Sequence, residues 1–256
     1  MASSSDQQRA SYVYGILPED IELGSGLAGV GDPPGQLRVV RSDDLAALVS
    51  DVDPARPLGS PDDLRAHKEI LDASAAEVPV LPLRFGAVLA SDDAVAEELL
   101  QPFHDEFSAA LDQLDGLAEY VVKGRYVEPR ILEELLSENP QAQRLREEIR
   151  GQDPDATREL RIQLGELISE AMSAKRETDT RALQDAMAGH CASSFVREPT
   201  HEDDAVHVAY LVETGQEKEM EKTVNDLTRK WEGRVELRVL GPMAAYDFVG
   251  TTQPGG

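Results

Sequence analysis

Apolar and β-branched residues gather in three short runs near the start of the chain. The first, at residues 12–17, is rich in tyrosine, valine and isoleucine and ends at Pro18, which is typical of a β-strand. Residues 37–41 and 45–52 predict two further strands joined by a polar turn, although the second run also fits a short helix. The chain therefore begins with a predicted sheet.

Apolar residues spaced three and four positions apart then predict two helices. The first begins after Ser60, a natural N-cap, with Pro61 in its first turn. The second begins after Ser91 and ends at Gly116, and Pro102 inside it predicts a kink. The apolar face of the first helix carries Leu64, His67, Leu71 and Ala75.

The segment between these helices, residues 78–86, is apolar but contains Pro79 and Pro82. Two prolines this close exclude a helix and remove two donors from any strand ladder. The segment is therefore predicted to be a packed edge or crossing segment. It contains one cation, Arg84, and burying a guanidinium costs several kcal/mol unless a carboxylate pairs with it. We therefore expect Arg84 to form an ion pair that holds the segment in place.

The remaining pattern is mainly helical and ends in a β-α-β unit. Residues 117–127 predict a strand, and residues 129–189 are charge-rich and almost wholly helical. Residues 206–212 and 235–240 predict strands on either side of a helix at 216–231. Strands and helices in this succession predict an α+β protein.

The pattern divides into two predicted domains. Residues 11–127 predict an N-terminal α+β domain of ferredoxin-like character, and residues 128–250 predict a C-terminal domain that is helical with a β-α-β unit. Residues 1–10 predict a disordered tail, and residues 251–256 a mobile one.

Charge and cysteine content narrow the classes of partner and compartment. The 256 residues include 49 acidic and 25 basic side chains, for a net charge of −24. Binding to nucleic acid or to anionic membranes requires clustered basic residues, so this balance argues against both partners. Cys191 is the single cysteine, which excludes an internal disulfide. The sequence shows neither a signal peptide nor an apolar run long enough to cross a membrane, so we expect a cytoplasmic protein.

The motifs that could carry chemistry fail on their context. Residues 24–29 match the glycine spacing of a dinucleotide-binding loop, but Pro33 and Pro34 follow where that loop needs a helix. His201 and His207 would lie about 20 Å apart along a strand, too far for one metal ion. With 49 acidic residues, carboxylate pairs occur by chance at any spacing. We expect no cofactor, no metal and no enzymatic activity.

Several segments, taken in order, resemble one known family. They are residues 12–16, His67, residues 80–86, 119–123, 208–212 and 241–248. Their most specific elements are Leu-Pro-Leu-Arg-Phe-Gly at 81–86 and the Gly-Pro ending followed by Tyr246 and Phe248. Together they resemble the gas vesicle synthesis protein L/F family (GvpF/GvpL), over residues 12–249.

This resemblance implies a function that the pattern of residues does not show. Members of the family are two-domain accessory proteins for assembling gas vesicles, the gas-filled protein shells that give cells buoyancy. The resemblance implies binding to the hydrophobic major shell protein and to other accessory proteins. It also implies a minor place in the vesicle and no enzymatic activity, so we expect a cytoplasmic protein associated with gas vesicles.

The candidate contact residues are Arg84, Phe85, Tyr246 and Phe248. Our hypothesis is that Arg84 fixes the extended segment, while Phe85, Tyr246 and Phe248 form an apolar patch that joins the two domains and contacts partners. Ordinary core packing explains the same pattern. The alternative functions are a ligand-binding or enzymatic α+β protein that uses a cleft between domains, and a regulatory module.

Overall fold

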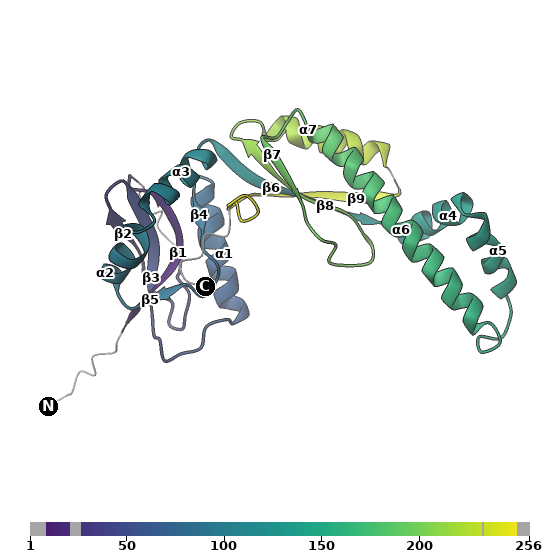
Figure 1. The fold of residues 1–256 in the computed structure, drawn as a ribbon, viewed down its shortest axis with the longest axis horizontal. Coiled ribbons are helices and arrows are strands. Elements are labelled where there is room, and N and C mark those ends of the chain that lie inside the picture. Colours follow the sequence, from purple (N-terminus) through teal and green to yellow (C-terminus); the bar gives the residue numbers. More distant parts are fainter. Residues whose placement is uncertain (1–8, 21–26, 232, 250–256) are drawn as a thin grey trace. The chain divides into compact units, whose positions relative to one another are not determined.

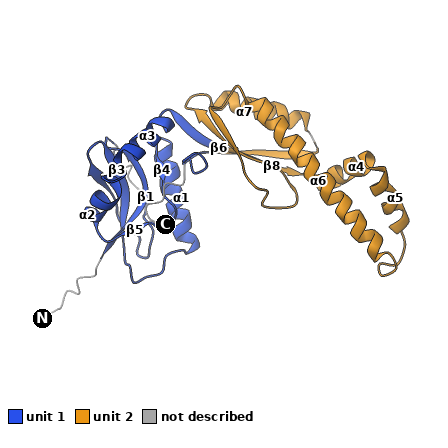
Figure 2. Ribbon diagram, in the orientation of Figure 1, with its two compact units in different colours: residues 1–120, 241–256 blue, residues 121–240 orange. Residues whose placement is uncertain are grey.

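The computed structural model describes residues 9–20, 27–231 and 233–249 (Figure 1). The chain forms two compact units, residues 1–120 with 241–256 (unit 1) and residues 121–240 (unit 2) (Figure 2). A compact unit does not have to fold by itself. The domain limits predicted from the sequence therefore remain a prediction. Residues 1–8 and 251–256 of the two predicted tails lie outside the described residues.

The sheet of unit 1 is built around its first strand. It comprises β1 (Ala10–Pro18), β2 (Leu37–Ser42), β3 (Leu45–Val52) and two short strands, β4 (Leu81–Pro82) and β5 (Val88–Leu89). The order is β2-β3-β1-β4, and β5 also pairs with β1. Strand β1 pairs antiparallel with β3, β4 and β5, and β2 pairs antiparallel with β3. The predicted strands at 12–17, 37–41 and 45–52 are thus present.

The helices of unit 1 are α1 (Pro61–Ala75), the three-residue α2 (Asp92–Ala94), a π-helical turn η1 (Val95–Leu100) and α3 (His104–Leu114). Ser60 caps α1, as its sequence predicts, because its side chain accepts a hydrogen bond from the third residue of the helix. The second predicted helix is interrupted next to Pro102, and α3 begins only at His104. Helix α1 contacts β1, and α3 contacts β1, β3 and β4.

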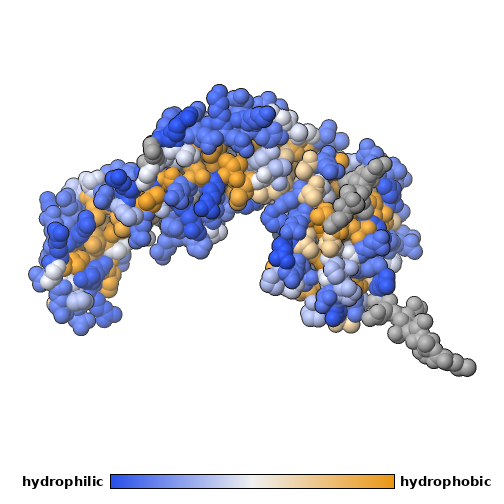
Figure 3. Space-filling view, turned by 180° about the vertical axis from the view of Figure 1, so that it is seen from behind, coloured by the Kyte–Doolittle hydropathy of each residue, from blue (hydrophilic) through white to orange (hydrophobic). Residues whose placement is uncertain are grey.

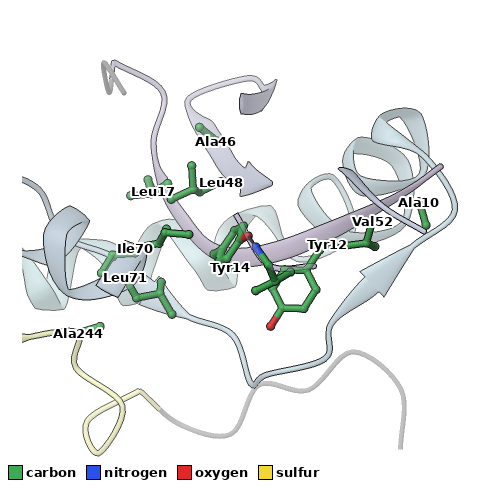
Figure 4. Packing of buried hydrophobic residues seen from close by; sticks show 12 residues of the cluster. Ala10, Tyr12, Tyr14, Leu17, Ala46, Leu48, Val52, Ile70, Leu71 and Ala244 are labelled. Atoms are coloured by element: carbon green, nitrogen blue, oxygen red, sulfur yellow. Dashed lines mark hydrogen bonds between the residues drawn. The ribbon is translucent and has the colours of Figure 1, made fainter. Parts of the chain in front are cut away.

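Close packing in unit 1 depends on the residues of β1 (Figure 4). Tyr12, Tyr14 and Leu17 are fully buried. A Cβ atom on Gly15 would lie 2.7 Å from the carbonyl oxygen of Leu81, so only glycine lets β4 approach β1 this closely. Other buried members of the core are Ala10, Ala46, Leu48, Val52, Ile70, Leu71 and Ala244.

The ferredoxin-like order predicted for the N-terminal domain is not confirmed. Helix α1 follows β3 rather than β1, and the described residues between β1 and β2 form turns and loop. A run of Gly and Pro in this connection, including Pro33 and Pro34, does not support a crossover helix. Local pattern identified the strands, but their order depends on pairing between distant segments.

Unit 2 contains most of a second antiparallel sheet. Its strands are β6 (Leu117–Tyr126), β7 (Ser193–Val196), β8 (Asp204–Glu213) and β9 (Val235–Met243), in the order β7-β8-β6-β9. Strands β6 and β9 each begin or end a few residues inside unit 1. The sequence pattern predicted β6, β8 and β9, whereas β7 was not predicted.

The helices of unit 2 are α4 (Glu128–Glu138), α5 (Pro140–Ile149), α6 (Arg158–Met187) and α7 (Glu217–Lys230). Helix α6 contacts β8 and α7, and its first half packs with α4 and α5 beyond the end of the sheet (Figure 1). The β-α-β-β-α-β succession, typical of ferredoxin-like folds, therefore occurs from β6 to β9.

A charged cluster connects these elements inside unit 2. Arg234 donates two hydrogen bonds to the Asp179 carboxylate, at 2.6 and 2.8 Å, and the Tyr126 hydroxyl donates a third at 2.8 Å. Burial, and then the bond to Asp179, raises the pKa of Tyr126. The Asp179 carboxylate is thus fully engaged, which ties α6 to β6 and to the residue just before β9.

No helix in the described part of the chain is long and apolar enough to cross a membrane. Most of the surface in Figure 3 is hydrophilic, with hydrophobic areas showing in both units. This agrees with the large excess of acidic side chains in the sequence.

Candidate functional site

A buried histidine, His67, lies at the centre of an aromatic cluster in unit 1. Its ring centroid lies 5.7 Å from that of Tyr12, 5.7 Å from that of Tyr14 and 5.5 Å from that of Phe85. The Tyr14 ring is stacked on the imidazole, and the other two meet it edge to face. Only 5% of His67 is exposed. We call Tyr12, Tyr14, His67, Phe85 and Tyr246 the His67 cluster.

Both nitrogens of His67 have hydroxyl partners. The Tyr12 hydroxyl lies 2.9 Å from Nδ1, and the Tyr246 hydroxyl lies 3.1 Å from Nε2. The backbone N–H of Gly86 donates to the same Tyr12 hydroxyl at 3.1 Å. Because a neutral imidazole has one donor and one acceptor, it can pair with both tyrosines at once. These bonds join β1, α1, the segment after β4 and the C-terminal segment.

The His67 cluster is uncharged near neutral pH. Burial lowers the pKa of His67 to about 4, although a hydrogen bond to the Leu83 backbone acts in the opposite direction. Burial also raises the pKa of Tyr12 and of Tyr246. A neutral, hydrogen-bonded cluster of this kind holds segments together and offers no charged group for proton transfer near neutral pH.

The position of His67 depends on how α1 begins. The Asp63 carboxylate accepts hydrogen bonds from the backbone N–H groups of Gly31 at 2.8 Å, Ser60 at 3.0 Å and Gly59 at 3.1 Å. Burial acts to raise the pKa of Asp63, but these bonds outweigh it and the pKa is lowered. The capping box therefore fixes the start of α1, and with it the turn that carries His67.

The C-terminal segment is bound to the same unit at three points. The N–H of Ala244 donates to Asp72 at 3.3 Å, and the N–H of Asp247 donates to Glu119 at 3.2 Å. Between them, Tyr246 reaches His67 and is still 39% exposed. This surface tyrosine thus lies on a segment that is held from both sides.

Comparison with known proteins identifies the family. The profile of the family "Gas vesicle synthesis protein GvpL/GvpF" matches residues 10–250. The chain belongs to the GvpL/GvpF family. Gas vesicle protein F of Streptomyces sp. (strain CB03234) is 32% identical over 244 residues, which cover 94% of this chain and 99% of that protein. Gas vesicle protein L of the same strain is 28% identical over 270 residues, covering 96% and 94% of the two chains.

Solved structures show that the fold is that of GvpF. The crystal structure of GvpF from Anabaena sp. PCC7120 superposes with a TM-score of 0.79 at 23% identity, covering 95% of this chain and 99% of that one. GvpF from Microcystis aeruginosa gives a TM-score of 0.74 at 23% identity, covering 93% and 98%. The family resemblance predicted from the sequence is confirmed.

The expectation of a buried, ion-paired Arg84 is wrong. Arg84 is exposed, and it forms no ion pair with any residue that the structure describes. The extended backbone alternates, so Arg84 faces outward while the Phe85 side chain is half-buried. Backbone hydrogen bonds hold this segment in place instead. One of them runs from the Leu83 N–H to the Tyr14 carbonyl at 2.8 Å.

Of the other three candidate contact residues, Phe85 and Tyr246 belong to the His67 cluster. Phe85 and Tyr246 both reach His67, although 160 residues separate them in the sequence. Phe248 is half-buried, and its backbone N–H donates to the Ala245 carbonyl at 3.2 Å. All four candidates belong to unit 1. The central place of His67 was not predicted; its signal in the sequence is a histidine on the apolar face of a helix.

The candidates for chemistry remain separate groups. No three His, Cys, Asp or Glu side chains converge on a possible metal site within the described ranges. Burial raises the pKa of Cys191, whose thiol donates to the Met187 carbonyl, so the reactive thiolate is disfavoured. Residues 24–26 of the glycine motif lie outside the described residues.

Proposed function

We propose that this chain is an accessory protein of gas vesicle assembly. It binds the hydrophobic major shell protein and other accessory proteins, and it is retained as a minor component of the vesicle. The observation that carries this proposal is the family match over residues 10–250, together with a gas vesicle protein F relative that is matched over 99% of its length. It acts in the cytoplasm, in association with the vesicle, and without catalysis.

The charge of the chain suits a protein that handles an apolar partner. A subunit that exposes apolar strand and helix surface before it polymerises is prone to aggregate. With a net charge of −24, copies of this chain repel each other at neutral pH. A complex between the two would keep the excess negative charge and therefore stay dispersed until the subunit is passed on to the growing shell.

We place one contact surface beside the His67 cluster. It comprises Arg84, Phe85, Tyr246 and Phe248. Arg84 is exposed and carries a charge that no described residue neutralises, and Tyr246 is also exposed. Beneath them, the cluster holds the backbone in place, so binding would require little ordering of the backbone that carries these side chains. Arginine and tyrosine are also, with tryptophan, enriched among the residues that contribute most to binding at protein interfaces.

Co-purification tests this placement. Immobilised wild-type chain should retain the major shell protein, and the Arg84→Ala and Phe85→Ala variants should retain several times less. Arg130→Ala, at an exposed position on α4, is the matched control and should bind as the wild type does. If the Arg84 and Phe85 variants fold normally and retain as much shell protein as the control, the placement is wrong.

A further inference from the structure

The sheet edges of this protein differ in how they are protected. An exposed edge strand invites pairing with other chains, and proteins usually place charges or proline there. Strand β2, at one edge, carries Arg38 and Arg41. Strand β9, at another, carries Glu236, Arg238 and Pro242. These two edges have the usual protection against strand addition.

The edge at β7 lacks that protection. Its four residues, Ser193–Val196, include neither a charged residue nor a proline, and all four are exposed. Phe195 is 49% exposed and Val196 is 47% exposed. Hydrogen bonds to β8 from the N–H groups of Ala192 and Arg197, both 2.8 Å, extend the ordered backbone by one residue at each end. The edge therefore combines an ordered backbone with exposed apolar side chains.

The pairing register shows which backbone groups are available. Phe195 lies opposite Ala209, and the Arg197 N–H donates to the His207 carbonyl. In an antiparallel pair, alternate residues direct both backbone groups to the neighbour and the residues between them direct theirs away. The N–H and C=O groups of Ser194 and Val196 therefore point away from β8, toward the open edge.

A groove of about 320 Å³ lies between α6 and the β7–β8 pair, and it reaches the end of β7 at Val196. Val196 lines it from the strand side, and Thr180 and Gln184 line it from the helix. The charged residues along it are balanced, Arg176, Arg181 and Arg197 against Glu177, Glu198 and Asp204. The chain as a whole has 25 basic and 49 acidic residues, so this groove is less negative than the average surface. A segment without net charge suits it best.

We propose that the open edge of β7 binds an uncharged, extended segment of the major shell protein as an added strand. The added strand pairs with the outward backbone groups of Ser194 and Val196 and places its side chains against Phe195 and in the groove. This inference rests on the proposed function and adds a second contact surface for the same partner. Pairing would cover the shell protein's own strand edge and so prevent premature polymerisation.

Two substitutions at one position separate the backbone from the side chain. Val196→Pro removes the outward N–H but leaves the ladder donors of Phe195 and Arg197 in place. Val196→Thr keeps the N–H and nearly the same shape. We expect Val196→Pro to weaken retention of the purified shell protein by the full-length chain about tenfold, through lost pairing and steric exclusion. Val196→Thr should retain it within about twofold.

A third variant covers the case in which the proline disturbs folding. Val196→Lys keeps the backbone donor but places a charge on the edge, and should weaken retention about as much as proline does. If Val196→Pro or Val196→Lys melts as the wild type does and retains the shell protein equally well, the inference is overturned while the proposed function stands. If the wild type itself retains none, both fail. If the wild type is a dimer that Val196→Pro dissociates, the edge binds a second copy, and the inference is wrong.

Discussion

Acidification tests the reasoning about the His67 cluster, because protonating His67 would place a positive charge in a buried site. The native pKa of about 4 lies below the ordinary value of 6.5. The stability contributed by neutral His67 is therefore fully present above about pH 6.5 and is lost as the pH falls toward 4. Protonation also leaves two donors on the ring, so that both tyrosine hydroxyls must then accept.

The size of the effect follows from this pKa difference. Each pH unit below 6.5 costs about 1.4 kcal/mol until the native pKa is reached. Between about pH 7.5 and about pH 4.5, His67 should thus reduce the free energy of unfolding of unit 1 by about 2.5 kcal/mol. That is a large part of the stability of an ordinary domain.

The assay is urea unfolding at both pH values, for the wild type and for His67→Gln, which cannot titrate. The variant should be less stable at neutral pH but should lose about 2.5 kcal/mol less on acidification. His104→Gln is the matched control with the opposite sign. Hydrogen bonds to Asp44 and then to Asp105 raise the pKa of His104, so its contribution is present at low pH and lost as the pH rises.

Equal losses on acidification in the wild type and in His67→Gln would refute this reasoning. So would a pKa near 6.5 in an NMR titration of the His67 ring, because an ordinary value requires a solvated imidazole.

Three further substitutions test packing and charge. Asp179→Asn leaves the Arg234 guanidinium largely buried with its main partner neutralised. The free energy of unfolding, measured with urea, should fall by about 3 kcal/mol. A loss under about 1 kcal/mol would contradict the role given to this pair. Gly15→Ala places a Cβ atom 2.7 Å from the Leu81 carbonyl oxygen and should lower the free energy of unfolding by about 1–3 kcal/mol. Gly165 has open space around it in α6, so Gly165→Ala should raise the free energy of unfolding by about 0.5–1 kcal/mol. Equal melting temperatures for the two alanine variants would show that β4 can move away.

Local chemistry made part of this fold predictable. Ser60 and Pro61 mark the start of α1, and Pro102 marks the interruption before α3. The strand-helix-strand pattern at the end of unit 2 is strong because α7 has a continuous apolar face, formed by Met220, Val224 and Leu227. In each case the signal lies within one turn or one element.

The rest depends on contacts between distant residues. Tyr246 meets a histidine 179 positions earlier in the sequence, which no local pattern indicates. The apolar character of residues 78–86 predicts burial throughout the segment, but an extended backbone turns alternate side chains outward, and Arg84 is exposed. Strand β7 is four residues long and exposed at each of them, so it has no apolar alternation to reveal it. Strand order, on which the unconfirmed ferredoxin-like prediction depends, is likewise set by long-range pairing.

Deletion of the gene for this chain tests the central claim most directly. In a host that makes gas vesicles, the proposed function predicts that the deletion strain forms no buoyant vesicles and that the wild-type chain restores them. Normal vesicle formation in the deletion strain, with the other gas vesicle genes intact, would contradict a role in assembly.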